Sequence, residues 1–137
     1  SNSCSTPYQP SDFLGGFTEL QLSSDSYQVS FGGNAYTSTQ RAIDFTLLRC
    51  AELALENGYQ YFVVINADNR TNERTSTNLV FTGRRGEDGR AERAERTSTT
   101  SKPSTTNTIR LLNQKPTDGF SYDAAITAAS IRGKYGL

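Results

Sequence analysis

Alternating apolar and polar residues near the start of the chain predict a β-hairpin. Every second position of 18–22 and of 27–31 shares one face of a short strand. The segment 23–26, which reads Ser-Ser-Asp-Ser, has the chemistry of a turn. The residues on the shared faces are Thr18, Leu20 and Leu22 in the first strand and Tyr27, Val29 and Phe31 in the second. We therefore expect two antiparallel strands here.

The next segment has the periodicity of an amphipathic helix. Thr37 and Gln40 have the spacing of a capping box, in which each side chain binds a free amide of the first turn. Apolar residues then recur along one face between 38 and 57, and Gly58 fits a left-handed C-cap. These apolar positions are Ile43, Phe45, Leu47, Leu48, Cys50, Ala51, Ala54 and Leu55. The pattern predicts a long helix.

Three further strands are expected in the second half of the chain. The segment 59–65 is dense in aromatic and β-branched residues without clean alternation, which is typical of a central strand covered on both faces. The Thr-rich segments 75–82 and 97–112 predict a long hairpin joined through a polar loop at 83–96. Pro103 should lie at an edge or a bulge, because proline cannot donate to a β-ladder.

The last predicted element is a helix over 122–132 that ends at Gly133. Ala125, Ile126 and Ala129 lie at helical spacing, and their small size favours close packing on the sheet. The fold class is therefore α+β with two layers, in the order ββαβββα. An antiparallel or mixed sheet of about five strands should pack against the long helix and the C-terminal helix.

Length and composition predict one domain. A chain of 137 residues suits a single hydrophobic core, which we place at 15–137. Residues 1–14 contain Pro7 and Pro10 without periodicity and are expected to form an extended leash, with Ser1 and Asn2 typical of a tag remnant. Fourteen basic and fourteen acidic residues cancel, so the net charge favours neither nucleic acid nor an anionic membrane as an electrostatic partner.

The residue types present exclude several kinds of catalytic site. The chain has no histidine, which excludes a Ser-His-Asp triad and an imidazole metal site. Only Cys50 falls within the predicted domain, which excludes a CxxC redox pair. Carboxylates remain as candidates for an acid/base pair, but none of them has motif spacing. They are Glu19, Asp25, Asp44, Glu52, Asp68, Asp118 and Asp123. We expect no catalytic residue, no metal and no cofactor.

Two candidate recognition surfaces stand out. The segment 84–96 carries the arginines Arg84, Arg85, Arg90, Arg93 and Arg96 among four acidic residues. It is interpreted as a solvated loop or a short salt-bridged helical turn that is able to bind a partner. Tyrosines form the second candidate, a pocket lined by Tyr27, Tyr36, Tyr59 and Tyr61, although core packing is the simpler role for these rings.

The two cysteines lie in different settings. Cys4 is in the polar tail, and Cys50 is in the middle of the predicted helix, where it is expected to act as a small buried apolar side chain. A disulfide between them stays open, because spacing alone does not establish a pairing.

Several stretches resemble a family of uncharacterised proteobacterial envelope lipoproteins. They are 27–38, 44–53, 58–62, 102–103, 122–124 and 134–136. The resemblance implies that the signal peptide is removed and that Cys4 receives a membrane-anchoring lipid, with Ser5 after it similar to lipoproteins sorted to the outer membrane. It implies a non-enzymatic protein of the cell envelope that faces the periplasm, and it supplies no catalytic residue.

The expected role is a binding or scaffolding module for an unknown envelope protein or cell-wall partner, and the oligomeric state stays open. A small-ligand carrier that uses the tyrosine pocket is an alternative. A carboxylate-dependent enzyme acting on envelope glycans is a further alternative, and it requires two acids in one cleft.

Overall fold

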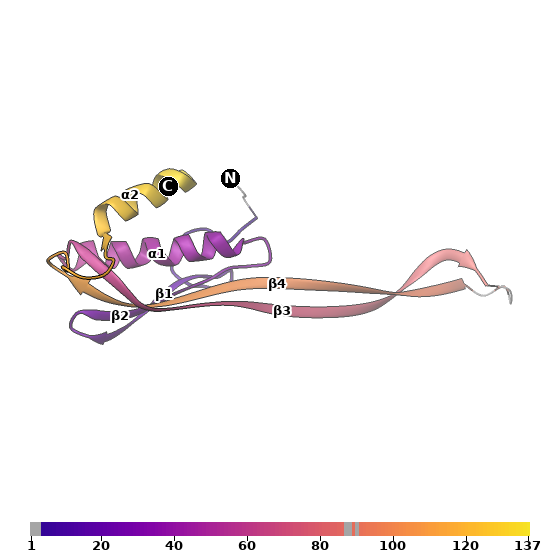
Figure 1. Cartoon of the computed structure of the whole chain (residues 1–137). Helices are drawn as coiled ribbons and strands as arrows, with labels where there is room; N and C mark the ends of the chain where they lie inside the picture. The colour runs from indigo at the N-terminus through magenta and orange to yellow at the C-terminus, as the bar shows by residue number, and fades with distance from the viewer. Residues whose placement is uncertain (1–3, 87–88, 90) are drawn as a thin grey trace.

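One antiparallel sheet carries two helices on one of its faces in this computed structural model (Figure 1). The structure describes residues 4–86, 89 and 91–137. The strands are β1 (Gly16–Ser23), β2 (Ser26–Gly32), β3 (Tyr61–Arg85), β4 (Ala91–Leu112) and β5 (Tyr122–Asp123). The helices are α1 (Thr39–Glu56) and α2 (Ala124–Tyr135). The α+β class and the order ββαβββα are confirmed, and the strands lie side by side as β1-β2-β4-β3-β5.

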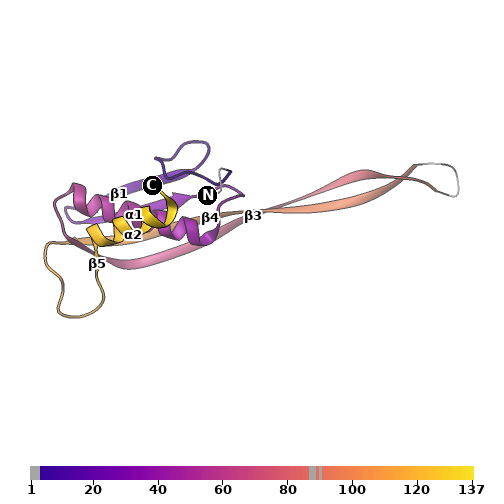
Figure 2. The same cartoon turned by 90° about the horizontal axis from the view of Figure 1, so that it is seen from above.

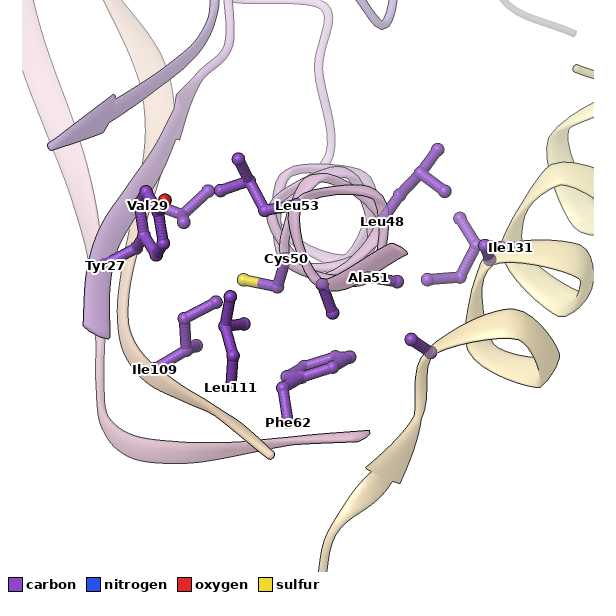
Figure 3. Packing of buried hydrophobic residues seen from close by; sticks show 13 residues of the cluster. Tyr27, Val29, Leu48, Cys50, Ala51, Leu53, Phe62, Ile109, Leu111 and Ile131 are labelled. Atoms are coloured by element: carbon purple, nitrogen blue, oxygen red, sulfur yellow. The ribbon is translucent and has the colours of Figure 1, made fainter. Parts of the chain in front are cut away.

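The core lies between α1 and the curved inner face of the sheet. Figure 3 shows α1 end-on, with β2, β3 and β4 curving around it and α2 on its other side. Phe62 of β3 and Ile109 and Leu111 of β4 are fully buried against Cys50 and Ala51 of α1. Burial of these apolar side chains is the main stabilising term of the domain.

The strand predicted at 59–65 is not the central one. It is the beginning of β3, which runs without interruption into the predicted strand at 75–82, and the centre of the sheet is β4. Only one face of β3 is covered, because both helices lie on the same side of the sheet. Phe62 is therefore buried, whereas Ile65 is 57% exposed. The fifth strand is the short β5, which pairs with β3 at Tyr61 and Phe62.

The face of β1 that carries Thr18, Leu20 and Leu22 is the open face of the sheet. Leu20 is 59% exposed, whereas its neighbour Glu19 points the other way and accepts hydrogen bonds from Arg49 of α1. In β2, by contrast, the predicted apolar face does meet α1, with Val29 and Phe31 fully buried.

The C-terminal end of α1 agrees with the prediction, but its N-cap does not. The Gly58 amide donates to the Leu55 carbonyl at 3.1 Å and the Tyr59 amide to the Ala54 carbonyl at 2.8 Å, with Gly58 at a φ of 80°. These two bonds are those of a Schellman cap. At the other end Ser38 is the N-cap, and its hydroxyl accepts from the Arg41 amide. The capping box at Thr37 and Gln40 is therefore wrong.

Helix α2 packs against α1 rather than on the sheet (Figure 1). Its buried residues are Ala124, Ala128 and Ile131, whereas Ile126, on the predicted packing face, is 66% exposed. The helix also continues through Gly133 and ends at Gly136, which has a φ of 69°. The predicted face and C-terminus of this helix were wrong because its packing partner is a helix rather than the sheet. No helix in the described ranges has the length and apolar character needed to cross a membrane.

The predicted N-terminal leash is packed on the domain from Ser5 onward. Thr6 is fully buried, its amide donates to the Thr37 hydroxyl at 2.9 Å, and its own hydroxyl accepts from the Asn34 amide at 2.8 Å. These contacts occupy Thr37, which explains why it does not cap α1. The Tyr8 hydroxyl donates to Glu52 of α1, so burial and this hydrogen bond raise the pKa of Tyr8.

A cluster around Asp44 joins the C-terminus to α1. The Asp44 carboxylate accepts hydrogen bonds from Lys134 Nζ at 2.8 Å, from the Tyr135 hydroxyl and from Gln40 Nε2 at 2.9 Å. Burial acts to raise the pKa of Asp44, but these hydrogen bonds outweigh it and hold that pKa below its ordinary value. The lowered pKa means that the ionised carboxylate stabilises the folded state.

Substitutions of Phe31 and Leu20 test which side chains of the β1–β2 hairpin face the core. Phe31→Ala removes a fully buried ring and is expected to lower the free energy of unfolding by about 3–5 kcal/mol. Leu20→Ala, on the neighbouring strand, should change it by less than about 0.5 kcal/mol because Leu20 lies on the open face. Urea unfolding followed by circular dichroism measures both, and equal losses would contradict the observed orientation of β1.

The Asp44 cluster predicts a pH-dependent contribution to stability. Because the folded-state pKa of Asp44 is below the unfolded value, the contribution is present above the ordinary value of 3.8 and is lost as the pH falls through the folded pKa. Asp44→Asn should lower the free energy of unfolding at pH 7 by up to about 1 kcal/mol, the range of surface ion pairs. The difference from wild type should shrink as the pH approaches 3.

The matched control is Asp118→Asn, at an exposed carboxylate in the segment before β5. Urea unfolding at pH 7 and pH 3 should give no pH-dependent difference for this variant. If the free energy of unfolding of Asp44→Asn differs from that of wild type by the same amount at both pH values, the charge of the Asp44 carboxylate does not contribute to stability.

Candidate functional site

The long hairpin of β3 and β4 projects far beyond the helices. The last pair between β2 and β4 is Gly32 with Ser104, and from the pair Thr71 with Pro103 outward, β3 and β4 pair only with each other. Figures 1 and 2 show this two-stranded ribbon extending from one end of the domain. At the usual rise per strand residue, the β4 segment 91–103 spans about 40 Å. We call the paired segments 71–85 and 91–103 the ribbon.

Pro103 lies at the point where the ribbon leaves the sheet. Its carbonyl accepts a hydrogen bond from the Gly33 amide at 2.9 Å, on the side away from β3. The nitrogen of a strand residue points to the same side as its carbonyl, so the missing N–H of Pro103 costs no bond to β3. The expected edge position of Pro103 is therefore confirmed.

The two faces of the ribbon carry different side chains. One face, which we call the basic face, holds the pairs Asn72–Lys102, Arg74–Thr100, Ser76–Ser98 and Asn78–Arg96. The opposite face, which we call the threonine face, holds the pairs Glu73–Ser101, Thr75–Thr99, Thr77–Thr97 and Leu79–Glu95. The two Thr–Thr pairs are in hydroxyl contact at 3.3 Å. The β-pairing register thus separates three cations from two carboxylates.

The cations of the basic face have no ion-pair partner among the residues that the structure describes. Arg74, Arg96 and Lys102 make no ion pair with any described residue, and the basic face as defined contains no carboxylate. The balanced charge of the whole chain therefore conceals a local excess of positive charge.

The segment predicted as a polar loop is largely part of the ribbon. Residues 83–85 belong to β3 and residues 91–96 to β4, so the salt-bridged helical turn is wrong. Extended pairing separates the predicted arginine group, because Arg96 pairs with Asn78 on one face and Arg93 with Phe81 on the other. Arg84 and Arg85 lie at the end of β3, and Arg90 lies outside the described residues.

The four candidate pocket tyrosines do not come together. Tyr27 is buried in the core and Tyr59 packs against that core beyond the C-terminus of α1. Tyr36 is 65% exposed near the N-terminus of α1, about 27 Å away along an 18-residue helix. Tyr61 is half-buried next to β5. Tyr27 and Tyr59 match the core-packing interpretation, whereas the exposed Tyr36 matches neither core packing nor a shared pocket.

Four of the seven candidate carboxylates are engaged in hydrogen bonds that involve α1 or α2. Glu52 accepts from Tyr8 and Arg132, Glu19 accepts from Arg49, and Asp123 accepts from the Ile126 amide as the N-cap of α2. Asp44 joins α1 to α2, as described above. Glu19 and Glu52 lie close together, because both carboxylates contact the guanidinium of Arg49, at 2.7 Å and 3.6 Å, and both are ion-paired to it. Asp44 and Asp123 are engaged elsewhere, with Lys134 and with the Ile126 amide.

The two cysteines differ in accessibility. Cys4 is exposed, Cys50 is buried, and no disulfide joins them. Burial raises the pKa of the Cys50 thiol to about 12, which keeps it protonated and unreactive at neutral pH. The Cys4 carbonyl accepts a hydrogen bond from Asn34 Nδ2 at 2.8 Å, which places Cys4 at the surface beside the end of β2.

An exposed apolar turn lies beside Cys4 and was not expected from the sequence. In this turn Phe13 is 95% exposed and Leu14 is 52% exposed. The sequence does contain a signal for this turn. Asp12 and Gly15 are residue types typical of turns, and two apolar residues lie between them.

Comparisons of the chain with protein-family models, with curated proteins and with solved structures give no match.

Proposed function

We propose that this protein is a non-enzymatic lipoprotein of the bacterial cell envelope that is held in the outer membrane by a lipid on Cys4. It faces the periplasm and acts as a binding or scaffolding module whose ribbon contacts an envelope protein or a cell-wall component. The observation that carries this proposal is the ribbon itself, which extends about 40 Å beyond the part of the sheet covered by helices.

A ribbon of this kind gains stability from a partner. Isolated two-stranded hairpins are marginal in water because they bury little apolar surface. In this ribbon the pairs from Glu73–Ser101 to Thr77–Thr97 are entirely polar and exposed. The outer edges of β3 and β4 also offer main-chain groups that another chain or a glycan is able to bind.

The position of Cys4 supports anchoring close to the domain. The segment from Ser5 onward is packed, so a lipid on Cys4 would hold the domain near the membrane without a long spacer. A non-enzymatic role is supported by the structural contacts of Asp44, Glu52 and Asp123, which leave these acids engaged in holding the fold.

Lipid attachment is tested by the intact mass of the full-length gene product, expressed with its native leader and extracted from bacterial membranes. The expected result is a mass increase of acyl-glyceryl size that is lost in Cys4→Ala. Cys50→Ala is the control, because its buried thiol should have no part in anchoring, and this variant should keep the added mass. An unmodified wild-type chain in the soluble fraction would reject the lipoprotein proposal.

The ribbon is tested by photo-crosslinking of the membrane-extracted protein. A photo-reactive amino acid at Thr77 or Thr99 should form discrete adducts in cells, whereas the same group at Ile126, exposed on α2, should not. A variant in which an Asn-Gly turn replaces residues 73–101 joins the paired residues Asn72 and Lys102 and should retain the thermal stability of the domain. Ribbon positions that give no adduct would exclude the ribbon as the binding element.

A further inference from the structure

The turn that carries Phe13 is held rigidly by the packed N-terminal segment. The Asp12 amide donates to the Gly15 carbonyl at 3.2 Å, and the Gly15 amide donates back at 3.1 Å. The Asp12 carboxylate accepts from the Leu14 amide at 2.7 Å, and the Leu14 carbonyl accepts from the buried Thr6 hydroxyl at 3.1 Å. The exposure of Phe13 is therefore imposed by a fixed backbone.

Gly15 shows how closely this turn is fitted to the sheet. Its φ of 100° is a conformation that favours glycine, and a Cβ at this position would lie 2.4 Å from the Gly32 carbonyl oxygen. The backbone at the base of the turn thus contacts the end of β2 directly, and the two apolar side chains at its tip point away from the core.

The apolar turn is continuous with the cations of the ribbon. Lys102 lines a hollow of about 430 Å³ together with the turn residues Phe13 and Leu14 and with Asn34, whose side chain binds the Cys4 carbonyl. Lys102 also lines a second hollow of about 510 Å³ with Arg74, at the start of the basic face. Two carboxylates lie nearby: Asp12, which is engaged in hydrogen bonds within the turn, and Glu73, which lines the second hollow.

We infer that this surface, formed by Phe13, Leu14, Lys102 and Arg74 beside Cys4, binds the surface of an anionic phospholipid bilayer. An exposed aromatic ring next to an aliphatic side chain fits the boundary between headgroups and acyl chains. Cations beside them match the negative surface potential of such a leaflet. The zero net charge of the chain does not oppose this, because the pairing register concentrates Arg74 and Lys102 on one face.

This surface deepens the proposed function and depends on it for its cellular setting. A lipid on Cys4 attaches the domain to the membrane at one point but does not set its orientation, so a second membrane contact beside the lipid restricts how the domain can rotate. The ribbon leaves the domain at the same end, so its direction relative to the membrane becomes defined (Figure 2).

Co-sedimentation of the unlipidated Cys4→Ala chain with vesicles tests the surface without the lipid anchor. The vesicles contain phosphatidylethanolamine and phosphatidylglycerol in a ratio of about 3:1, which gives them a negative surface potential. The chain should bind these vesicles, and binding should weaken as salt is raised. Phe13→Ser should weaken the partition by about tenfold, since full burial of a large apolar side chain is worth at least that factor. Lys102→Glu should weaken it by at least about fivefold, the effect of one interfacial cation.

The matched control is Phe120→Ser. Phe120 is 75% exposed, but it lies in the segment between β4 and β5, at the end of the domain opposite the ribbon (Figure 2). Its substitution should leave vesicle binding unchanged. Binding that is equally reduced by Phe120→Ser, or that is unaffected by Phe13→Ser, would overturn the inference.

The outcome is distinguishable from failure of the proposed function. Suppose that the native chain is acylated at Cys4 but the unlipidated chain does not bind vesicles. The lipoprotein proposal would then stand, and this surface would be excluded as a membrane contact. Loss of ribbon adducts in cells on Phe13→Ser, without any vesicle binding, would assign the turn to a protein partner and likewise overturn the inference.

Discussion

The packing of α1 into the curve of the sheet is the contact on which the rest of the structure depends. An 18-residue helix is about 27 Å long and covers about eight residues of a strand lying along it. Strands β1 and β2 have eight and seven residues and fit this length, whereas β3 and β4 have 25 and 22. The excess length of β3 and β4 has no helix to cover it. The core therefore determines where the globular part ends and the ribbon begins.

The side chains change character at this limit. On the inner face of β4, Ile109 and Leu111 are buried under α1, and Thr105 and Asn107 are still buried farther toward the ribbon. Beyond Pro103 the exposed residues of β4 are polar or charged, as a ribbon in contact with water requires, and Leu79 of β3 is an exposed apolar exception. The same chain thus supplies a stable base and a projecting element, and the N-terminal segment with Cys4 is attached to the base where the ribbon leaves it.

Local patterns predicted those features that depend on neighbouring residues. The alternation in 27–31, the helix that ends at Gly58, and the pairing of the Thr-rich segments all appear in the structure. The edge position of Pro103 followed from its missing N–H alone. Predictions failed where a contact with a distant residue replaced the expected local one. The Thr6 amide binds the Thr37 hydroxyl, so Ser38 caps α1 instead. Helix α2 packs against α1 rather than on the sheet, so Ile126 is exposed to solvent.

The candidate site shows the same division. By itself, the sequence determined the residue types available for chemistry, including the absence of histidine, and it located the arginines and the two cysteines. It did not determine which charges share a face, because Arg74 and Lys102 are 28 positions apart and meet only through the register of β3 with β4. Periodicity reports the faces of one element, whereas register, the covered side of the sheet and the place of Phe13 beside Cys4 depend on contacts between distant segments. Only the tertiary structure decided these, since such contacts are selected by the burial of the whole core rather than by any local stretch of sequence.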